Sequence, residues 1–256
     1  MQSVKLFHQV YGEGEPLIIM HGLFGTYENW GTQIKALAEH FQVIAVDMRN
    51  HGRSDHDSVM DYPAMAADIV ELMDDLGLES ANILGHSMGG KAAMQLALNH
   101  PERLRKLIVV DIAPVEYKPH HDDVFTGLYA VQLDQLKSRG DADKQLAAHV
   151  DELGVRAFLL KNLYRDENKQ FRWRMNLDVL RDEYVHIGAA PSGTPFQGTT
   201  LFIKGENSHY LLPEHRDQVL TLFPNTSYKL MQGAGHWPHA EKPSIFGKIV
   251  LGFLLD

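Results

Sequence analysis

The sequence contains no cysteine. Disulfide bonds, thiolate nucleophiles and cysteine-ligated zinc or iron–sulfur sites are therefore excluded. The absence of cysteine fits a reducing compartment. The first eight residues alternate polar and apolar side chains and lack the apolar core of a secretory signal. We therefore expect a cytoplasmic protein.

Long apolar runs and positive charge are also scarce. No run approaches the ~20 apolar residues that a membrane-spanning helix needs, so we expect no membrane span. The formal net charge of −9 argues against a nucleic-acid partner, because such domains normally carry a basic surplus. With 44% hydrophobic and 22% charged residues, the 256-residue chain is typical of one globular α/β domain with room for an inserted subdomain.

The sequence Gly-x-Ser-x-Gly at residues 85–89 is flanked by segments that predict its local structure. Residues 81–84 form an apolar run that predicts a buried strand, and residues 91–99 are helix formers. A strand, a glycine-flanked turn and a helix are the context of a nucleophile elbow. Such a turn strains the backbone of Ser87, exposes its hydroxyl and leaves no room for a Cβ at the flanking glycines. The helix that follows aims its amides at developing negative charge.

Short apolar runs alternate with amphipathic helices over most of the chain, which predicts βαβ crossovers and a mainly parallel sheet with flanking helices. Functional residues of such sheets gather at the carboxyl ends of the strands. His21, Asp47, Ser87 and Asp111 each follow one of these runs. We therefore expect these four residues at one edge of the sheet.

The pattern changes between Pro114 and Pro195, where helical periodicity prevails and no convincing buried strand occurs. Residues 164–174 depart from this periodicity and predict either a short hairpin or a loop. We therefore predict an α/β core built from residues 1–113 and 196–256. Residues 114–195 are predicted to form an all-helical cap, or lid, inserted over the sheet edge.

Four motifs resemble those of the α/β-hydrolase superfamily, in its order and approximate spacing. They are His21-Gly22-x-x-Gly25, Asp47-x-Arg49-x-x-Gly52-x-Ser54, Gly85-x-Ser87-x-Gly89 and Gly235-His236. One such motif is weak, but four in order over the whole chain are highly specific for the fold. Residues 85–91, 110–114 and 202–205 are most similar to small bacterial esterases of this superfamily. The resemblance implies an α/β-hydrolase fold and an acyl-ester or thioester hydrolase with a helical cap.

Ser87 is the expected nucleophile, and it needs a base because a free serine hydroxyl is too weakly acidic to attack an ester unaided. His236 is the candidate base. It lies in a glycine-flanked loop near the C-terminus, which agrees with the chain order serine, acid, histidine of this fold. The alternative for His236 is a loop histidine packed against Trp237.

The acid of the triad has two candidates. The family most often places it after the strand that here spans residues 199–203, but Ser208 stands where the usual aspartate would fall. Glu206 lies two positions away from that place. Asp111 ends the strand directly after that of the nucleophile, and we prefer it because it matches the pattern of the bacterial esterases. A strand-end carboxylate that caps the next turn is the alternative for Asp111.

The resemblance also implies an oxyanion hole, which needs two backbone amides aimed at the tetrahedral oxygen. Met88, directly after the nucleophile, is expected to supply one amide. Leu23 is expected to supply the other, because this family draws its second amide from that loop. His86 and Trp237 are candidates for lining the substrate pocket, with packing as the alternative for both.

Two clusters in the predicted cap remain. Residues 120–123, His-His-Asp-Asp, look like metal ligands, but adjacent residues cannot all converge on one ion. We therefore expect a solvated loop there, with no metal and no cofactor. A basic stretch includes Lys161, Arg165, Lys169, Arg172 and Arg174. Such stretches are usually solvated faces, and the alternative is a receptor for an anionic leaving group such as a coenzyme A phosphate.

The sequence thus predicts a serine esterase or thioesterase that acts on small-molecule acyl esters, with acyl-CoA thioesters as further candidates. Carbon–carbon bond hydrolases, perhydrolases and some lyases share this triad and fold, so these classes stay open. Haloalkane dehalogenation is disfavoured, because it requires a carboxylate where this chain has Ser87. A non-catalytic binding module is the remaining alternative, and the intact Ser87, His236 and acid argue against it.

Overall fold

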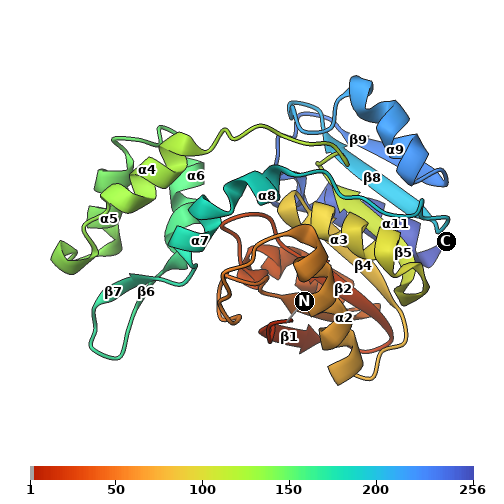
Figure 1. Ribbon diagram of the computed structural model, residues 1–256, viewed down its shortest axis with the longest axis horizontal. Helices are drawn as coiled ribbons and strands as arrows, with labels where there is room; N and C mark the ends of the chain where they lie inside the picture. Colours follow the sequence, from red (N-terminus) through yellow and green to blue (C-terminus); the bar gives the residue numbers. More distant parts are fainter. Residues whose placement is uncertain (1–2) are drawn as a thin grey trace.

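A seven-stranded sheet forms the centre of the computed structural model, which describes residues 3–256 (Figure 1). Its strands are β1 (His8–Tyr11), β2 (Glu15–Met20), β3 (Phe41–Val46), β4 (Ala81–His86), β5 (Leu104–Val110), β8 (Thr200–Gly205) and β9 (Thr226–Met231). They lie in the order β1-β3-β2-β4-β5-β8-β9. Strand β1 pairs antiparallel with β3, and the other neighbours pair parallel. The predicted mostly parallel sheet is confirmed.

Helices cover both faces of this sheet (Figure 1). They are α1 (Gly31–Leu37), α2 (Tyr62–Asp75), α3 (Met88–Asn99), α9 (Arg216–Leu222), α10 (Pro238–Glu241) and α11 (Pro243–Leu255), with 3-10 turns η1 (Tyr27–Trp30), η2 (Pro101–Arg103) and η5 (Pro213–His215). On β2, Ile18 and Met20 pack in the apolar cluster that includes α2 and α3. Leu17 and Ile19 pack in the cluster of α1 and α11 on the opposite face. Burial on both faces explains why the run is apolar throughout.

The segment between β5 and β8 projects to one side of the sheet (Figure 1). It contains α4 (Asp122–Ala130), α5 (Arg139–Leu146), α6 (Leu153–Leu159), α7 (Leu177–Asp182), α8 (Tyr184–Gly188) and the turns η3 (Leu133–Gln135) and η4 (Leu160–Asn162). It also contains an antiparallel pair, β6 (Leu163–Arg165) and β7 (Phe171–Trp173). The expectation of an all-helical insertion is wrong here, and the hairpin alternative for residues 164–174 is confirmed.

The hairpin forms because its turn is closed by a side chain. The carboxylate of Asp166 accepts hydrogen bonds from the backbone N–H groups of Asn168 and Gln170, at 3.0 and 2.8 Å. Lys169 adopts the left-handed conformation that turns the chain, with φ of 61°. An Asx-type turn of this kind competes with helical hydrogen bonding and breaks the helical pattern.

Lys91 joins this segment to the core. Its side chain rises from α3, is 1% exposed, and donates hydrogen bonds to the carbonyl oxygens of Gly188 and Ala189 at 2.8 and 2.7 Å. The backbone N–H of Tyr117 also donates to Gly188, so the chain entering the segment and the chain leaving it meet at one point. Burial lowers the pKa of Lys91 to about 7. Within residues 3–256, none of the helices is both apolar and long enough to span a membrane.

Candidate active site

Ser87 occupies the sharp turn between β4 and α3, with φ of +52°. The two flanking glycines let the turn close. A Cβ on Gly85 would lie 2.2 Å from the carbonyl oxygen of Gly89, and a Cβ on Gly89 would lie 2.5 Å from that of His21. Real Cβ atoms do not approach oxygen so closely, so both positions require glycine. The strain at Ser87 is held in place by tight packing around it.

Ser87, His236 and Asp111 form a continuous chain of hydrogen bonds. The Ser87 hydroxyl and the Nε2 atom of His236 are 3.0 Å apart, and the Nδ1 atom of His236 is 2.7 Å from a carboxylate oxygen of Asp111. Because the carboxylate accepts, the Nδ1 atom must carry the proton, which leaves Nε2 free to accept the proton of the serine. The arrangement can generate a nucleophile and then protonate a leaving group.

Glu206, the other candidate for the acid of the triad, lies outside this chain of hydrogen bonds. Glu206 is exposed, and its carboxylate accepts from the backbone N–H of Gly233 at 2.7 Å. Asp111 is fully buried, and its other donors are the backbone N–H of Gly205, at 2.9 Å, and the hydroxyl of Ser208. Ser208 therefore stands at the family's usual acid position and supports the carboxylate of Asp111 instead.

Leu23 and Met88, whose amides were expected to form the oxyanion hole, both lie beside Ser87 and border the same small cavity. Met88 is the first residue of α3, so its amide has no acceptor within the helix. Gly22 brings the Leu23 loop against the nucleophile, because a Cβ on Gly22 would lie only 3.2 Å from the Cβ of Ser87.

Two buried histidines hold the loop that contains Leu23. His51 accepts a hydrogen bond from the backbone N–H of Phe24 at Nε2, and its Nδ1 faces the carbonyl oxygen of Arg49 at 2.9 Å. His21 accepts from the N–H of Met48 and donates to the carbonyl oxygen of Gly22. Each ring thus serves as donor on one side and acceptor on the other, which only the neutral form can do. Burial lowers the pKa of His51 to about 3 and that of His21 to about 4.

His86, the residue before Ser87, supports the loop that contains His236. His86 is 4% exposed, and its Nε2 lies 2.7 Å from the backbone carbonyl oxygen of His236, to which it donates. The His86 ring also packs against the rings of His236 and His239, each with centroids 4.7 Å apart. His86 and Trp237, the two candidates for pocket lining, both border the main cavity.

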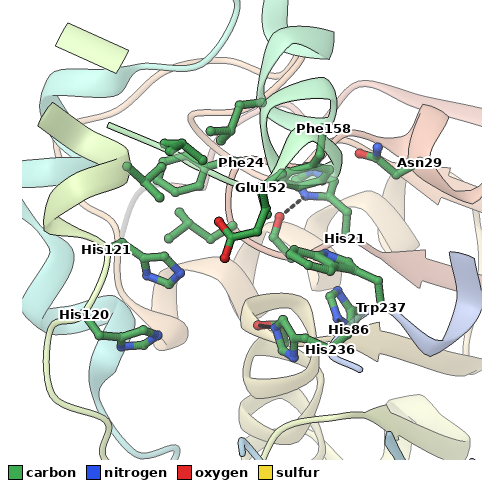
Figure 2. Close-up of a pocket in the computed structure, with 18 of the residues that line it drawn as sticks. His21, Phe24, Asn29, His86, His120, His121, Glu152, Phe158, His236 and Trp237 are labelled. Atoms are coloured by element: carbon green, nitrogen blue, oxygen red, sulfur yellow. Dashed lines mark hydrogen bonds between the residues drawn. The ribbon is translucent and has the colours of Figure 1, made fainter. Parts of the chain in front are cut away.

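The main cavity has a volume of about 540 Å³ and opens over Ser87. Helices α4 and α6 supply one wall, and in Figure 2 the carboxylate of Glu152 projects into the space between His121 and Trp237. Asn29 and Trp30 of η1 line the same cavity. Sequence analysis missed these three residues, because no motif marks them and because only the docking of α6 on the core brings Glu152 to the cavity.

The His-His-Asp-Asp cluster has ordinary hydrogen-bond partners. His120 and His121 interact with the hydroxyl groups of Tyr210 and Tyr184. Across the part of the chain that the structure describes, no three histidine, aspartate or glutamate side chains are grouped so that they could hold a metal ion.

The residues of the basic stretch have different surroundings. Lys161, Arg165 and Arg174 border a surface groove of about 460 Å³, together with Arg139 of α5. Arg172 instead forms an ion pair with Asp166 at 3.3 Å, and Lys169 lies in the hairpin turn. The groove residues are close in sequence to residues of the main cavity, since Lys161 lies two positions after Leu159 and Glu28 precedes Asn29.

Comparison with known proteins gives one consistent result. Residues 15–243 match the family described as alpha/beta hydrolase fold. Esterase YbfF of Escherichia coli is 40% identical over 94% of this chain and 93% of its own, and the mouse sn-1-specific diacylglycerol lipase ABHD11 is 40% identical over 93% of this chain and 80% of its own. A solved marine microorganism esterase superposes with a TM-score of 0.96, at 40% identity over 98% of this chain and all of its own.

Replacing Asp111 with asparagine is expected to lower kcat for p-nitrophenyl acetate by about 10⁴-fold, because the amide cannot stabilise the imidazolium or hold the required tautomer. Glu206→Gln is the matched control and should leave kcat unchanged. Steady-state kinetics test this, with circular dichroism to show that both variants fold. Loss of activity in the Glu206 variant alone would assign the acid to Glu206.

Stability should fall as the pH decreases from about 6.5 to 4. The folded-state pKa of His51, about 3, lies below its ordinary value of 6.5, so in this range the unfolded chain binds a proton that the folded chain does not. Each histidine of this kind removes on the order of 1 kcal/mol of unfolding free energy per pH unit. Urea unfolding from pH 7 to 4.5 measures this slope.

The variant His51→Asn should unfold with a shallower pH slope than the wild type. His100→Asn is the control, because the side chain of His100 is 41% exposed. A wild-type unfolding free energy that stays constant over this pH range would contradict the proposed neutrality of the buried histidines.

Proposed function

The chain belongs to the α/β-hydrolase family and is a carboxylic ester hydrolase, and on that premise we propose that it cleaves acyl esters through an acyl-enzyme on Ser87. The continuous hydrogen-bond chain from Asp111 through His236 to Ser87 supports this proposal most directly. The esterases and the lipase that resemble the chain favour ester hydrolysis over carbon–carbon bond hydrolysis, perhydrolysis and lyase chemistry.

In the proposed first half-reaction, the Ser87 oxygen attacks the ester carbonyl while His236 takes the hydroxyl proton. The backbone amides of Leu23 and Met88 stabilise the oxyanion of the tetrahedral intermediate. The carbon–oxygen bond to the alcohol then breaks, and His236 returns the proton to the departing oxygen. Asp111 stays ionised and stabilises the imidazolium between these two transfers.

In the second half-reaction, water replaces the alcohol at the same side of the acyl carbon. His236 takes a proton from the water as its oxygen attacks, and it gives this proton to the Ser87 oxygen when the acyl-enzyme bond breaks. The products are a carboxylic acid and an alcohol, and the enzyme returns to its starting protonation state.

Residues 114–195 act as a cap in this proposal. Helices α4 and α6 provide a wall of the cavity above Ser87, and Lys91 fixes the end of α8 to α3. A wall over the nucleophile excludes bulk water and strengthens the electrostatic stabilisation of the oxyanion.

Mixing the enzyme with excess p-nitrophenyl acetate should release a burst of p-nitrophenolate, equal to the enzyme concentration, if deacylation is the slower half-reaction. Ser87→Ala should abolish both the burst and the steady state. A fluorophosphonate label should add its mass to the peptide that contains Ser87, and His236→Ala should slow that labelling. Wild-type turnover in the Ser87 variant would overturn the proposal.

A thioester with an anionic leaving group, such as acyl-CoA, is a second candidate, and the basic groove favours it. Arg139, Lys161, Arg165 and Arg174 border this groove, whose residues Glu28 and Lys161 lie within two positions of residues that line the main cavity. Arginine forms strong charge-assisted hydrogen bonds with phosphate. A pantetheine-like arm in the cavity would bring its phosphates toward this groove.

Charge reversal at two groove residues, Lys161→Glu with Arg174→Glu, should lower kcat/KM for acetyl-CoA roughly 10-fold or more. Hydrolysis of the uncharged p-nitrophenyl acetate should not change. Arg172→Glu is the matched control, because Arg172 pairs with Asp166 outside the groove. Equal effects on both substrates would exclude the groove as a phosphate site.

A further inference from the structure

Two cavities border Ser87. The main cavity of about 540 Å³ is lined in part by α4 and α6. A second, of about 40 Å³, adjoins it along Leu23, Ser87, His120 and His121, and is also bordered by Met88, Ile112, Ile187 and Tyr210. An ester bound at Ser87 has two parts that must point in different directions, so the two cavities pose the question of which part each one receives.

The position of His236 distinguishes the two cavities. His236 borders the main cavity but not the small one. The ring of Tyr210 stacks on the imidazole, with centroids 4.0 Å apart and planes 28° apart, and Tyr210 itself borders the small cavity. The tyrosine ring therefore separates the base from the small cavity.

The chemistry of the leaving group determines which of the two cavities holds the alcohol. When the tetrahedral intermediate collapses, the bond from the acyl carbon to the alcohol oxygen breaks, and that oxygen must receive a proton from the Nε2 atom of His236. The alcohol therefore lies on the His236 side, in the main cavity. The acyl carbon stays bonded to Ser87, and its oxyanion faces the amides of Leu23 and Met88. The acyl chain takes the remaining direction, away from His236, where Ile112 and Ile187 border the small cavity.

We infer that the small cavity is the acyl site and the main cavity the leaving-group site, so that the enzyme selects short acyl groups on bulky alcohols or thiols. This inference rests on the proposed function. A volume of about 40 Å³ has room for on the order of three water molecules, so only a short acyl chain fits beyond the carbonyl.

Ile187 is the specificity-determining residue of this site. It lies in α8 at the end of the cap, is 7% exposed and borders the small cavity. The Ile187 side chain packs in the apolar cluster that includes α2 and α3, and its backbone carbonyl oxygen accepts a hydrogen bond from the hydroxyl of Tyr62. Truncation of the side chain therefore enlarges the cavity while this hydrogen bond remains.

The test varies the two halves of the ester separately. One series holds p-nitrophenol constant and lengthens the acyl chain from acetyl to decanoyl. The other holds acetyl constant and enlarges the alcohol from ethyl to 2-(1-naphthyl)ethyl, so that the acidity of the leaving alcohol stays nearly the same. We expect wild-type kcat/KM to fall roughly 10-fold or more for each methylene of the acyl chain beyond the cavity, with an optimum at four carbons or fewer. The naphthylethyl ester should be cleaved at least as well as the ethyl ester.

Ile187→Ala should move the acyl optimum to chains about two carbons longer. Val155→Ala is the matched control, because Val155 borders the main cavity alone. It should leave the acyl optimum in place and change only the alcohol series. The wild-type profile tests the assignment without any variant, so a poorly folded Ile187 variant does not decide the result.

The outcomes separate the inference from the function on which it rests. A wild-type optimum at octanoyl or longer overturns the acyl-site assignment while ester hydrolysis stands. An acyl optimum that moves with Val155→Ala and not with Ile187→Ala reverses the two sites. Failure to cleave any ester of either series overturns the proposed function and the inference together.

Discussion

The buried carboxylate of Asp111 is the interaction on which the site depends. An ionised carboxylate that is fully removed from water costs several kcal/mol unless its lone pairs are satisfied. Its partners come from the ends of two strands: Gly205 ends β8 and Ser208 follows it, and His236 follows β9. Since β5, β8 and β9 are consecutive neighbours in the sheet, their carboxyl ends deliver these groups to one point. The same contact therefore stabilises the sheet edge and orients the base.

A second constraint acts on the opposite side of the nucleophile. The loop with Leu23 is held by His21 and His51, each of which needs a neutral ring to satisfy both of its hydrogen bonds. The proposed mechanism therefore needs His236 to gain and lose a proton beside two imidazoles that stay neutral. Burial lowers the pKa of both His21 and His51, which keeps them in the neutral form.

The sequence was sufficient for those parts of the site that local rules control. The elbow needs glycines at fixed spacing and buried strands need apolar runs, so the turn at Ser87 and the sheet could be predicted. The choice of Asp111 over Glu206 depended on the resemblance to bacterial esterases. The cap could not be predicted to the same depth. The turn at Asp166 broke the helical periodicity, and Glu152 enters the cavity only through the docking of α6. Arg172 looked equivalent to its basic neighbours, but its pairing with Asp166 depends on the hairpin.

Docking of residues 114–195 on the core and the proposed recognition of the acyl group involve the same atoms. Lys91, which donates to the carbonyl oxygens at the end of α8, also borders the small cavity, as does Gly188. Gly188 must be glycine, since a Cβ there would lie 2.5 Å from the carbonyl oxygen of Tyr117. The Lys91 hydrogen bonds hold α8, and with it Ile187, against α3. The small cavity therefore keeps its size only while α8 is docked, so the proposed acyl selectivity depends on the same contact that docks this segment.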